Sequence, residues 1–213
     1  MSRLRITEIF HSLQGESRTV GIPTVFIRLT GCPLRCGYCD TEHAFSGGEW
    51  MQIDDILARV AALGAGYVTV TGGEPLAQKS CLELLTRLCD AGYEVSLETS
   101  GAIDVSSVDP RVVKVMDLKT PGSGEVEKNL YENIRHLSPR DQVKFVICDR
   151  ADYEWTKAKL DEYGLPARAE VLVSPCVGRQ DPAELADWIL QDRLPVRFQI
   201  QLHKYLWGEA RGR

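Results

Sequence analysis

The sequence lacks the features of membrane, secreted and nucleic-acid-binding proteins. No apolar run in its 213 residues approaches the length that spans a bilayer, and charged residues interrupt the N-terminal segment, so it has no signal-peptide core. Basic residues are in the minority, with 25 Lys and Arg against 30 Asp and Glu, and no run of like charge stands out. We therefore expect a cytoplasmic protein with no nucleic-acid partner and no membrane contact.

The sequence also lacks a disulfide framework. The number of cysteines, seven, is odd, and Cys32, Cys36 and Cys39 cluster within eight residues while the others are scattered. In a reducing compartment a tight group of thiols binds metal more often than it forms disulfides. Isolated cysteines are usually small buried side chains, so we expect Cys81 and Cys89, eight residues apart on one helical pattern, to pack in the core.

No linker, repeat or low-complexity stretch divides the chain, so we expect one domain over residues 1–213. Short runs rich in Val, Ile and Phe alternate with helical patterns, which predicts an α/β fold. The predicted strands are 24–29, 67–71, 94–98, 112–117, 142–148, 169–174 and 196–202, and the helical patterns are 53–61, 82–88, 155–160 and 185–189. Several strands are almost continuously apolar, as buried parallel strands are, but periodicity alone does not distinguish a barrel from a doubly wound sheet.

Unusual residues follow the predicted strands at their carboxyl ends. A loop with three cysteines, residues 31–41, follows the first strand, and residues 71–75, Thr-Gly-Gly-Glu-Pro, follow the second. Residues 98–101, 117–121 and 173–176 follow the third, fourth and sixth. Because parallel α/β proteins build their sites at the carboxyl ends of strands, one rim of the sheet is expected to carry the chemistry.

The cysteine loop, residues 31–41, has the spacing C-x3-C-x2-C, with Gly and Pro to bend it. Three thiolates so placed can converge on one centre. One hypothesis is a zinc-binding structural module in which His43 completes a Cys3His set. The other is a four-iron four-sulfur (4Fe–4S) cluster with three protein ligands, which leaves one iron open for a small molecule. The spacing favours the cluster.

The cysteine loop resembles the signature of the radical S-adenosylmethionine (SAM) superfamily, in which an aromatic residue, here Tyr38, precedes the last cysteine. Residues 71–75 resemble the superfamily's GGE-type motif, which implies that backbone near Gly73 and the acidic Glu74 engage the methionine ammonium. The resemblance implies a partial or distorted (β/α) barrel with the cluster loop after its first strand. It also implies a 4Fe–4S cluster whose open iron binds SAM, and a 5′-deoxyadenosyl radical that takes hydrogen from a substrate.

Four further segments, residues 10–17, 26–29, 39–41 and 201–204, resemble the 7-carboxy-7-deazaguanine synthase family. This implies conversion of 6-carboxy-5,6,7,8-tetrahydropterin to 7-carboxy-7-deazaguanine, by ring contraction and loss of ammonia, in the biosynthesis of queuosine and other 7-deazapurines. It also implies a homodimer that uses SAM, Mg²⁺ and a flavodoxin-type electron donor. A small activase of glycyl-radical enzymes is the alternative within the superfamily, but it leaves residues 12–16 and 201–204 unexplained.

The resemblance further implies a role for each matched residue. Cys32, Cys36 and Cys39 would bind the cluster, Thr41 would bind Mg²⁺, and Tyr38, Cys39, Asp40, Gly73, Asp117, Leu118, Lys119, Val173, Ser174, Pro175 and Cys176 would contact SAM. Leu13, Gln14, Gly15, Arg28, Thr71 and His203 would contact the substrate.

Some of these roles have plainer alternatives. Arg28 would pair with the substrate carboxylate through a bidentate fork, or would form a salt bridge inside the barrel. Thr41 could be a turn hydroxyl, and His203 an ordinary hydrogen-bonded histidine. Glu98, Ser100 and Ser123 fall on the same rim without an assigned ligand, and the polar tail, residues 208–213, has no assigned role.

Overall fold

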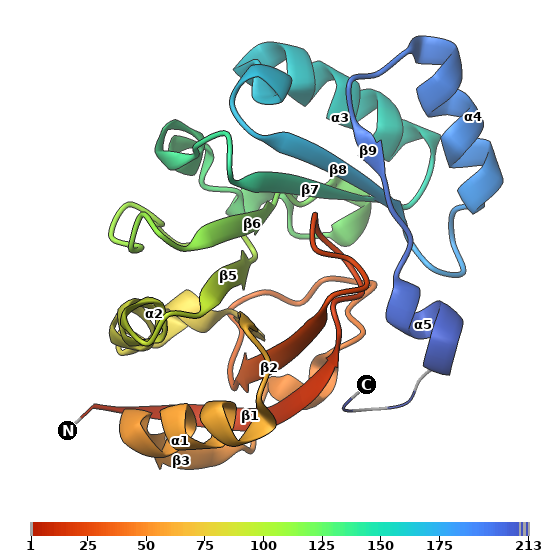
Figure 1. Ribbon diagram of the computed structural model, residues 1–213. Coiled ribbons are helices and arrows are strands. Elements are labelled where there is room, and N and C mark those ends of the chain that lie inside the picture. Colours follow the sequence, from red (N-terminus) through yellow and green to blue (C-terminus); the bar gives the residue numbers. More distant parts are fainter. Residues whose placement is uncertain (1, 209, 211, 213) are drawn as a thin grey trace.

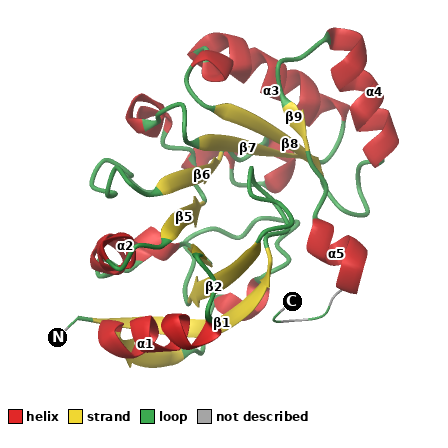
Figure 2. Cartoon of the chain, in the orientation of Figure 1, coloured by secondary structure: helices red, strands yellow, loops and turns green. Residues whose placement is uncertain are grey.

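A curved, nine-stranded sheet organises the part of the chain described by the computed structural model, which is residues 2–208, 210 and 212 (Figures 1 and 2). The strand order is β3-β1-β2-β4-β5-β6-β7-β8-β9. The strands are β1 (Arg3–Leu13), β2 (Pro23–Leu29), β3 (Glu49–Gln52), β4 (Tyr67–Gly72), β5 (Glu94–Thr99), β6 (Val113–Asp117), β7 (Gln142–Ile147), β8 (Glu170–Pro175) and β9 (Arg197–Phe198). Strands β2 and β4 to β9 are parallel, whereas β1 is antiparallel to both β2 and β3.

The helices lie on the outer side of this sheet, as Figure 1 shows for α1 to α4. They are α1 (Ile53–Leu63), α2 (Cys81–Asp90), α3 (Arg150–Tyr163), α4 (Pro182–Asp192) and the short α5 (Leu202–Trp207). Each of the first four buries an apolar stripe against the strands, and Leu84, Leu85 and Leu88 of α2 are fully buried. Cys81 is also fully buried and Cys89 packs against the same cluster, as predicted.

The sheet curls without closing, so the predicted partial barrel is confirmed. Six of the seven predicted strands form. The seventh, residues 196–202, is mostly wrong: only Arg197–Phe198 pairs with β8, and Leu202 already begins α5. The chain leaves the sheet there because the Leu202 N–H donates to Gly15 O at 3.0 Å. This contact places α5 beside the open side of the barrel (Figure 1).

Two strands, β1 and β3, were not predicted. They extend the sheet on the far side of β2, and the register pairs Phe10 with Phe26, whose rings stack with centroids 5.0 Å apart. Among the described residues, no helix is long and apolar enough to cross a bilayer.

Candidate functional site

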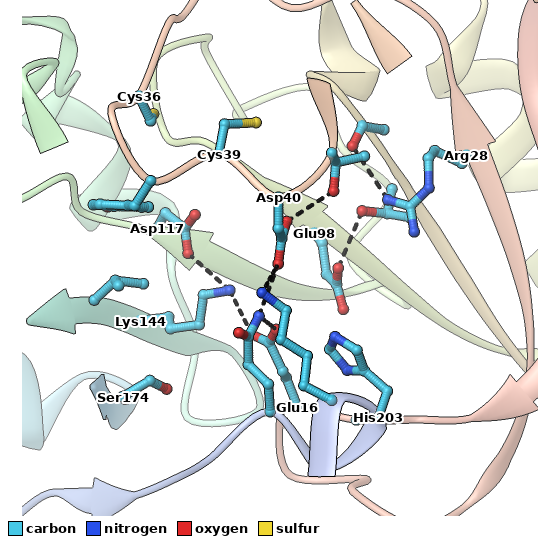
Figure 3. Close-up of a pocket in the computed structure, with 18 of the residues that line it drawn as sticks. Glu16, Arg28, Cys36, Cys39, Asp40, Glu98, Asp117, Lys144, Ser174 and His203 are labelled. Atoms are coloured by element: carbon cyan, nitrogen blue, oxygen red, sulfur yellow. Dashed lines mark hydrogen bonds and ion pairs between the residues drawn. The ribbon is translucent and has the colours of Figure 1, made fainter. Parts of the chain in front are cut away.

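A cavity of about 610 Å³ opens at the carboxyl ends of the parallel strands. Most of the predicted site residues line it, namely Leu13, Gln14, Gly15, Arg28, Cys32, Cys36, Tyr38, Cys39, Asp40, Thr41, Thr71, Gly73, Asp117, Lys119, Ser174, Pro175, Cys176 and His203. Figure 3 shows Cys36 and Cys39 on one side of this space and Arg28, Glu98 and His203 on another. The parallel sheet thus brings residues from distant segments of the chain to one rim, as predicted.

Two predicted SAM contacts do not line the cavity, and we correct them. Leu118 and Val173 are about 1% exposed and pack in the core under α3 and α4. Val173 precedes Ser174 on β8, and because side chains alternate across a strand, only one of the two can face the cavity. Ser123, which had no assignment, is also buried outside the cavity wall and holds the cysteine loop through its carbonyl.

The cysteine loop follows β2 and is held open toward the cavity by its own hydrogen bonds. The guanidinium of Arg35 donates to the carbonyl oxygens of Cys32 and Leu34 at 2.8 and 2.7 Å, and the Cys39 N–H donates to Cys36 O. All three cysteines are half-buried, and burial raises the pKa of each thiol. The backbone N–H groups of Leu34 and Thr41 oppose that rise at Cys32 and Cys39, which favours the thiolates that iron requires.

This donor set fits a cluster better than a single zinc ion. His43, the fourth ligand of the zinc hypothesis, instead lies 3.4 Å from a carboxylate oxygen of Glu8. Within residues 2–208, 210 and 212, no three His, Cys, Asp or Glu side chains are grouped closely enough to hold one metal ion. In a 4Fe–4S cluster each cysteine binds a different iron, so its three thiols do not need to meet at one point.

The Gly-Gly turn after β4 packs directly on the cysteine loop. A Cβ on Gly73 would lie 2.0 Å from Gly31 O and 2.8 Å from the Cβ of Cys32, so only glycine fits there. The next residue, Glu74, is fully buried, and its carboxylate accepts hydrogen bonds from Thr99 and Ser100. The expectation that the Glu74 side chain faces the methionine ammonium is therefore wrong: it anchors the turn from behind.

Charged side chains alternate in sign across the floor of the cavity. Lys144 donates to Glu16 at 2.7 Å and lies 3.3 Å from Asp117 (Figure 3). Asp117 also pairs with Lys119. Burial would raise the pKa of Glu16 and of Asp117. Lys144 and a hydrogen bond from Gln201 outweigh it at Glu16, and Lys119 and Lys144 outweigh it at Asp117, so both pKa values are lowered. The carboxylates in turn raise the pKa of Lys119 and Lys144 despite their burial, so all four groups are charged at neutral pH.

The end of the cysteine loop is tied to α5 and the residue before it. Asp40 accepts hydrogen bonds from Gln201 at 3.0 Å and from Thr41 at 2.9 Å, and it lies 3.1 Å from the ammonium of Lys204. Confinement in the cavity would raise the pKa of Asp40, but Lys204 and these hydrogen bonds hold it well below its ordinary value. Gln201 also donates to Glu16 at 2.9 Å, so it joins the loop to the charged floor.

A second group of polar side chains lies under the β1–β2 side of the cavity. Gln14 is 2% exposed and donates to Glu98 at 3.3 Å, and Glu98 also accepts from Thr71 at 3.0 Å. Burial raises the pKa of Glu98. His203 packs on Gly15 so closely that a Cβ there would lie 2.2 Å from the imidazole Nδ1.

Arg28 takes part in the salt bridge that was weighed as its alternative role. Its Nε donates to Glu8 at 2.7 Å, and its side chain is 17% exposed. One guanidinium nitrogen, Nη1, also lies 3.4 Å from Gly72 O. The guanidinium therefore has one carboxylate partner from β1 and still lines the cavity.

Sequence reasoning missed several residues of the cavity: Glu8, Glu16, Lys144, Gln201 and Lys204. Lys144 could have been identified from the sequence, because it is a charged residue inside the apolar strand β7. Such a residue is buried only when it is paired with an opposite charge. Gln201 and Lys204 lie in a segment singled out for its resemblance. Glu16 lies in residues 10–17, which were also singled out for their resemblance, whereas nothing in the local sequence marked Glu8.

Comparisons with known proteins agree with this arrangement. The family model described as the radical SAM superfamily matches residues 26–188. The chain is 46% identical to the 7-carboxy-7-deazaguanine synthase of Chlorobaculum tepidum, over 98% of this chain and 97% of that protein, and 43% identical to the one from Koribacter versatilis, over 96% and 97%.

Solved structures show the same fold. The crystal structure of QueE from Escherichia coli superposes with a TM-score of 0.77 at 25% identity and covers 94% of this chain and 95% of that one. SuiB from Streptococcus suis superposes with a TM-score of 0.59 at 16% identity, over 79% of this chain and 46% of that one, a likeness of fold alone.

Proposed function

The chain belongs to the radical SAM superfamily and, within it, to the family of 7-carboxy-7-deazaguanine synthases, and on that premise we propose that it converts 6-carboxy-5,6,7,8-tetrahydropterin to 7-carboxy-7-deazaguanine. The observation that carries the proposal is a single cavity that joins the cysteine loop to a wall of buried polar side chains. When bound, the 4Fe–4S cluster and SAM of this superfamily supply the radical that removes a hydrogen atom from the substrate.

We assign the cluster to Cys32, Cys36 and Cys39. SAM would lie beside the cluster, against Tyr38 and the backbone at Gly73 and with its nucleoside toward Lys119 and residues 174–176. The close packing of Gly73 on the cysteine loop supports this placement, because it leaves main-chain groups exposed to a ligand that sits next to the cluster.

Thr41 is our candidate for the magnesium ligand. Its hydroxyl donates to Asp40, which orients the oxygen lone pairs, and the side chain lines the cavity. Mg²⁺ keeps several waters and shares its coordination sphere with substrate oxygens, so one protein oxygen can be enough.

The substrate would occupy the β1–β2 side of the cavity. Gln14 and Glu98 present an amide and a carboxylate, which match the donors and acceptors of a pterin ring, and Thr71 holds Glu98 in place. His203 would cover the ring from α5. We assign the substrate carboxylate to Arg28, because its guanidinium still lines the cavity beyond the salt bridge with Glu8.

We expect Arg28→Ala to separate the two halves of the reaction. The variant should still cleave SAM to 5′-deoxyadenosine at a measurable rate, whereas formation of 7-carboxy-7-deazaguanine should fall by about 100-fold, since a charge-assisted carboxylate contact worth roughly 3 kcal/mol is lost. Both products are measured by mass spectrometry in one reaction mixture.

The matched control is Glu8→Gln, which removes the salt bridge but keeps the guanidinium. It should retain most of the product formation. Equal losses in both variants would assign Arg28 to the salt bridge alone and would contradict its role toward the substrate.

The decisive test of the function is reconstitution under anaerobic conditions. The protein, loaded with iron and sulfide, is incubated with dithionite, SAM, MgCl₂ and 6-carboxytetrahydropterin, and 7-carboxy-7-deazaguanine is expected. Cleavage of SAM without this product would contradict the substrate and favour another radical enzyme such as an activase. A protein that takes up one zinc and no sulfide would contradict the whole proposal. Omission of MgCl₂ tests the metal assigned to Thr41.

We extend the proposal to the biological setting, where the family resemblance is the support. The enzyme would be a cytoplasmic homodimer built from one domain per chain, would receive electrons from a flavodoxin-type protein and would supply the pathway that modifies transfer RNA with queuosine. Analytical ultracentrifugation and turnover with reduced flavodoxin in place of dithionite would test the dimer and the donor.

A further inference from the structure

Residues 120–125, which we call the clamp, hold the middle of the cysteine loop. The Arg35 N–H donates to the carboxylate of Glu125, and the Gly37 N–H donates to Ser123 O at 2.9 Å. These two N–H groups belong to the residues on either side of Cys36. The clamp therefore fixes the backbone on both sides of this cysteine.

The clamp is a tight turn with its own internal hydrogen bonds. The Ser123 hydroxyl donates to Thr120 O at 2.6 Å and accepts from the Glu125 N–H at 3.0 Å. Both Thr120 and Ser123 are almost fully buried. Because the turn is held together internally, it can move as a unit, and what sets its position is its attachment to the sheet.

The Thr120 hydroxyl lies 2.9 Å from Val146 O on β7, and the rest of that attachment comes from Asp152, in the first turn of α3. It is 1% exposed, and its Oδ1 accepts from the Gly122 N–H at 2.8 Å while its Oδ2 accepts from the Thr120 hydroxyl at 2.9 Å. The same Oδ2 accepts from the Cys148 N–H, directly after β7, at 3.0 Å. One buried carboxylate thus joins the clamp to the end of β7, although it does not line the cavity.

We propose that Asp152 is a positioning residue for the iron–sulfur cluster, which it serves by holding the clamp and, through the clamp, the backbone around Cys36. The inference rests on the proposed role of Cys36 as a cluster ligand. Buried partners that orient metal ligands typically change metal affinity by about 10- to 100-fold when they are replaced.

Asp152→Asn tests the inference because it replaces one carboxylate oxygen with an NH₂ group of nearly equal size. Either orientation of the amide places a donor against an N–H donor, that of Gly122 in the clamp or that of Cys148 after β7. The link between the clamp and the sheet therefore loses a hydrogen bond and gains a repulsion. In the cluster-free protein, hydrogen exchange of the amides of residues 35–37 should accelerate. In the reconstituted protein, loss of iron to a chelator should be about tenfold faster, and the electron paramagnetic resonance spectrum of the reduced cluster should change.

The chain offers a matched control in Asp141. It is also 1% exposed and accepts from the backbone N–H groups of Lys114 and Ser138, both at 2.7 Å, but it lies at the amino end of β7, away from the cysteine loop. Because Asp141 also pairs with the buried Lys114 ammonium at 3.1 Å, Asp141→Asn should lower the melting temperature at least as much, yet leave iron retention and the spectrum as in the wild type.

Thr120→Val is the second variant, in case Asp152→Asn does not fold. It keeps the shape of the side chain and removes the hydroxyl that Asp152 accepts, which also lies 2.9 Å from Val146 O. The variant therefore loosens the clamp at both contacts and should shift the same three measurements in the same direction. The inference would be overturned if both variants folded and had the same hydrogen exchange, iron retention and spectrum as the wild-type protein. Failure of the wild-type protein to hold a cluster would instead overturn the proposed function on which the inference rests.

Discussion

Cys36→Ala is expected to reduce formation of 5′-deoxyadenosine from SAM to background. Cys36 lies between the other two cysteines on a loop that the clamp holds on both sides, and its side chain lines the cavity. Without its thiolate, a second iron of the cluster would have no protein ligand, and the cluster would not survive reconstitution. The measurement is iron and acid-labile sulfide per chain, together with SAM cleavage in the presence of dithionite.

Cys89→Ala is the control for this experiment. Cys89 is half-buried like Cys36, but it is on α2, packs against the apolar core and lies outside the cavity. This variant should bind iron and sulfide and cleave SAM as the wild type does. If Cys36→Ala retained iron, sulfide and cleavage, the cysteine loop would not be the cluster site.

Most of the strands that the sequence predicted correctly are buried on both faces. Residues 68–71 and 171–175 are buried throughout, and their Val and Leu residues identify them without any tertiary information. Strand β1 carries a different pattern, since Leu4 and Ile6 are buried while Arg3 and Arg5 are exposed. That alternation of period two is typical of a strand with one face in water, and it was the signal available for β1. Strand β3 is too short to show any period.

The candidate site was predictable where a role depends on a motif within one segment. The cysteine loop and the Gly-Gly turn are such segments, and the sheet brings them together because both follow parallel strands. The pairings among Lys144, Glu16 and Gln201 join residues that are more than a hundred positions apart or lie near opposite ends of the chain. No local pattern encodes those contacts. They depend on how the barrel curls and where α5 crosses its open side.

Lys144→Met is expected to destabilise the protein by about 3 kcal/mol at neutral pH, because it leaves two buried carboxylates without their shared cation. The Lys144 side chain is 14% exposed, and those of Glu16 and Asp117 are both 18% exposed, so solvent compensates for little of the loss. Methionine fills the space of the lysine stem, which separates the effect of charge from that of a cavity. The free energy of unfolding, measured by denaturant titration, gives the difference from the wild type.

The pH dependence of this loss distinguishes an electrostatic origin from a packing defect. In the wild type, Glu16 and Asp117 have lowered pKa values, so their contribution to stability is present above their ordinary pKa range and is lost as the pH falls through the lowered values. In Lys144→Met, Glu16 stays buried but has lost the positive charge that lowered its pKa. Its pKa therefore rises toward or above the value in the unfolded chain. The variant should therefore lose less stability than the wild type on acidification, and the difference between them should shrink as the pH falls below about 4.5, the ordinary pKa of Glu16, toward its lowered value.

Lys157→Met provides the comparison at the surface. Lys157 pairs with Asp192 at 2.7 Å, but on an exposed face of α3, where such a pair contributes little to stability and salt screens it. A deficit in Lys144→Met that stayed constant with pH would assign the loss to packing and contradict the charged floor. A deficit that shrinks with acid would instead identify Lys144 as the cation that keeps Glu16 ionised. Because Glu16 accepts from Gln201, and Gln201 also donates to Asp40, the same cation would then help to hold α5 against the end of the cysteine loop.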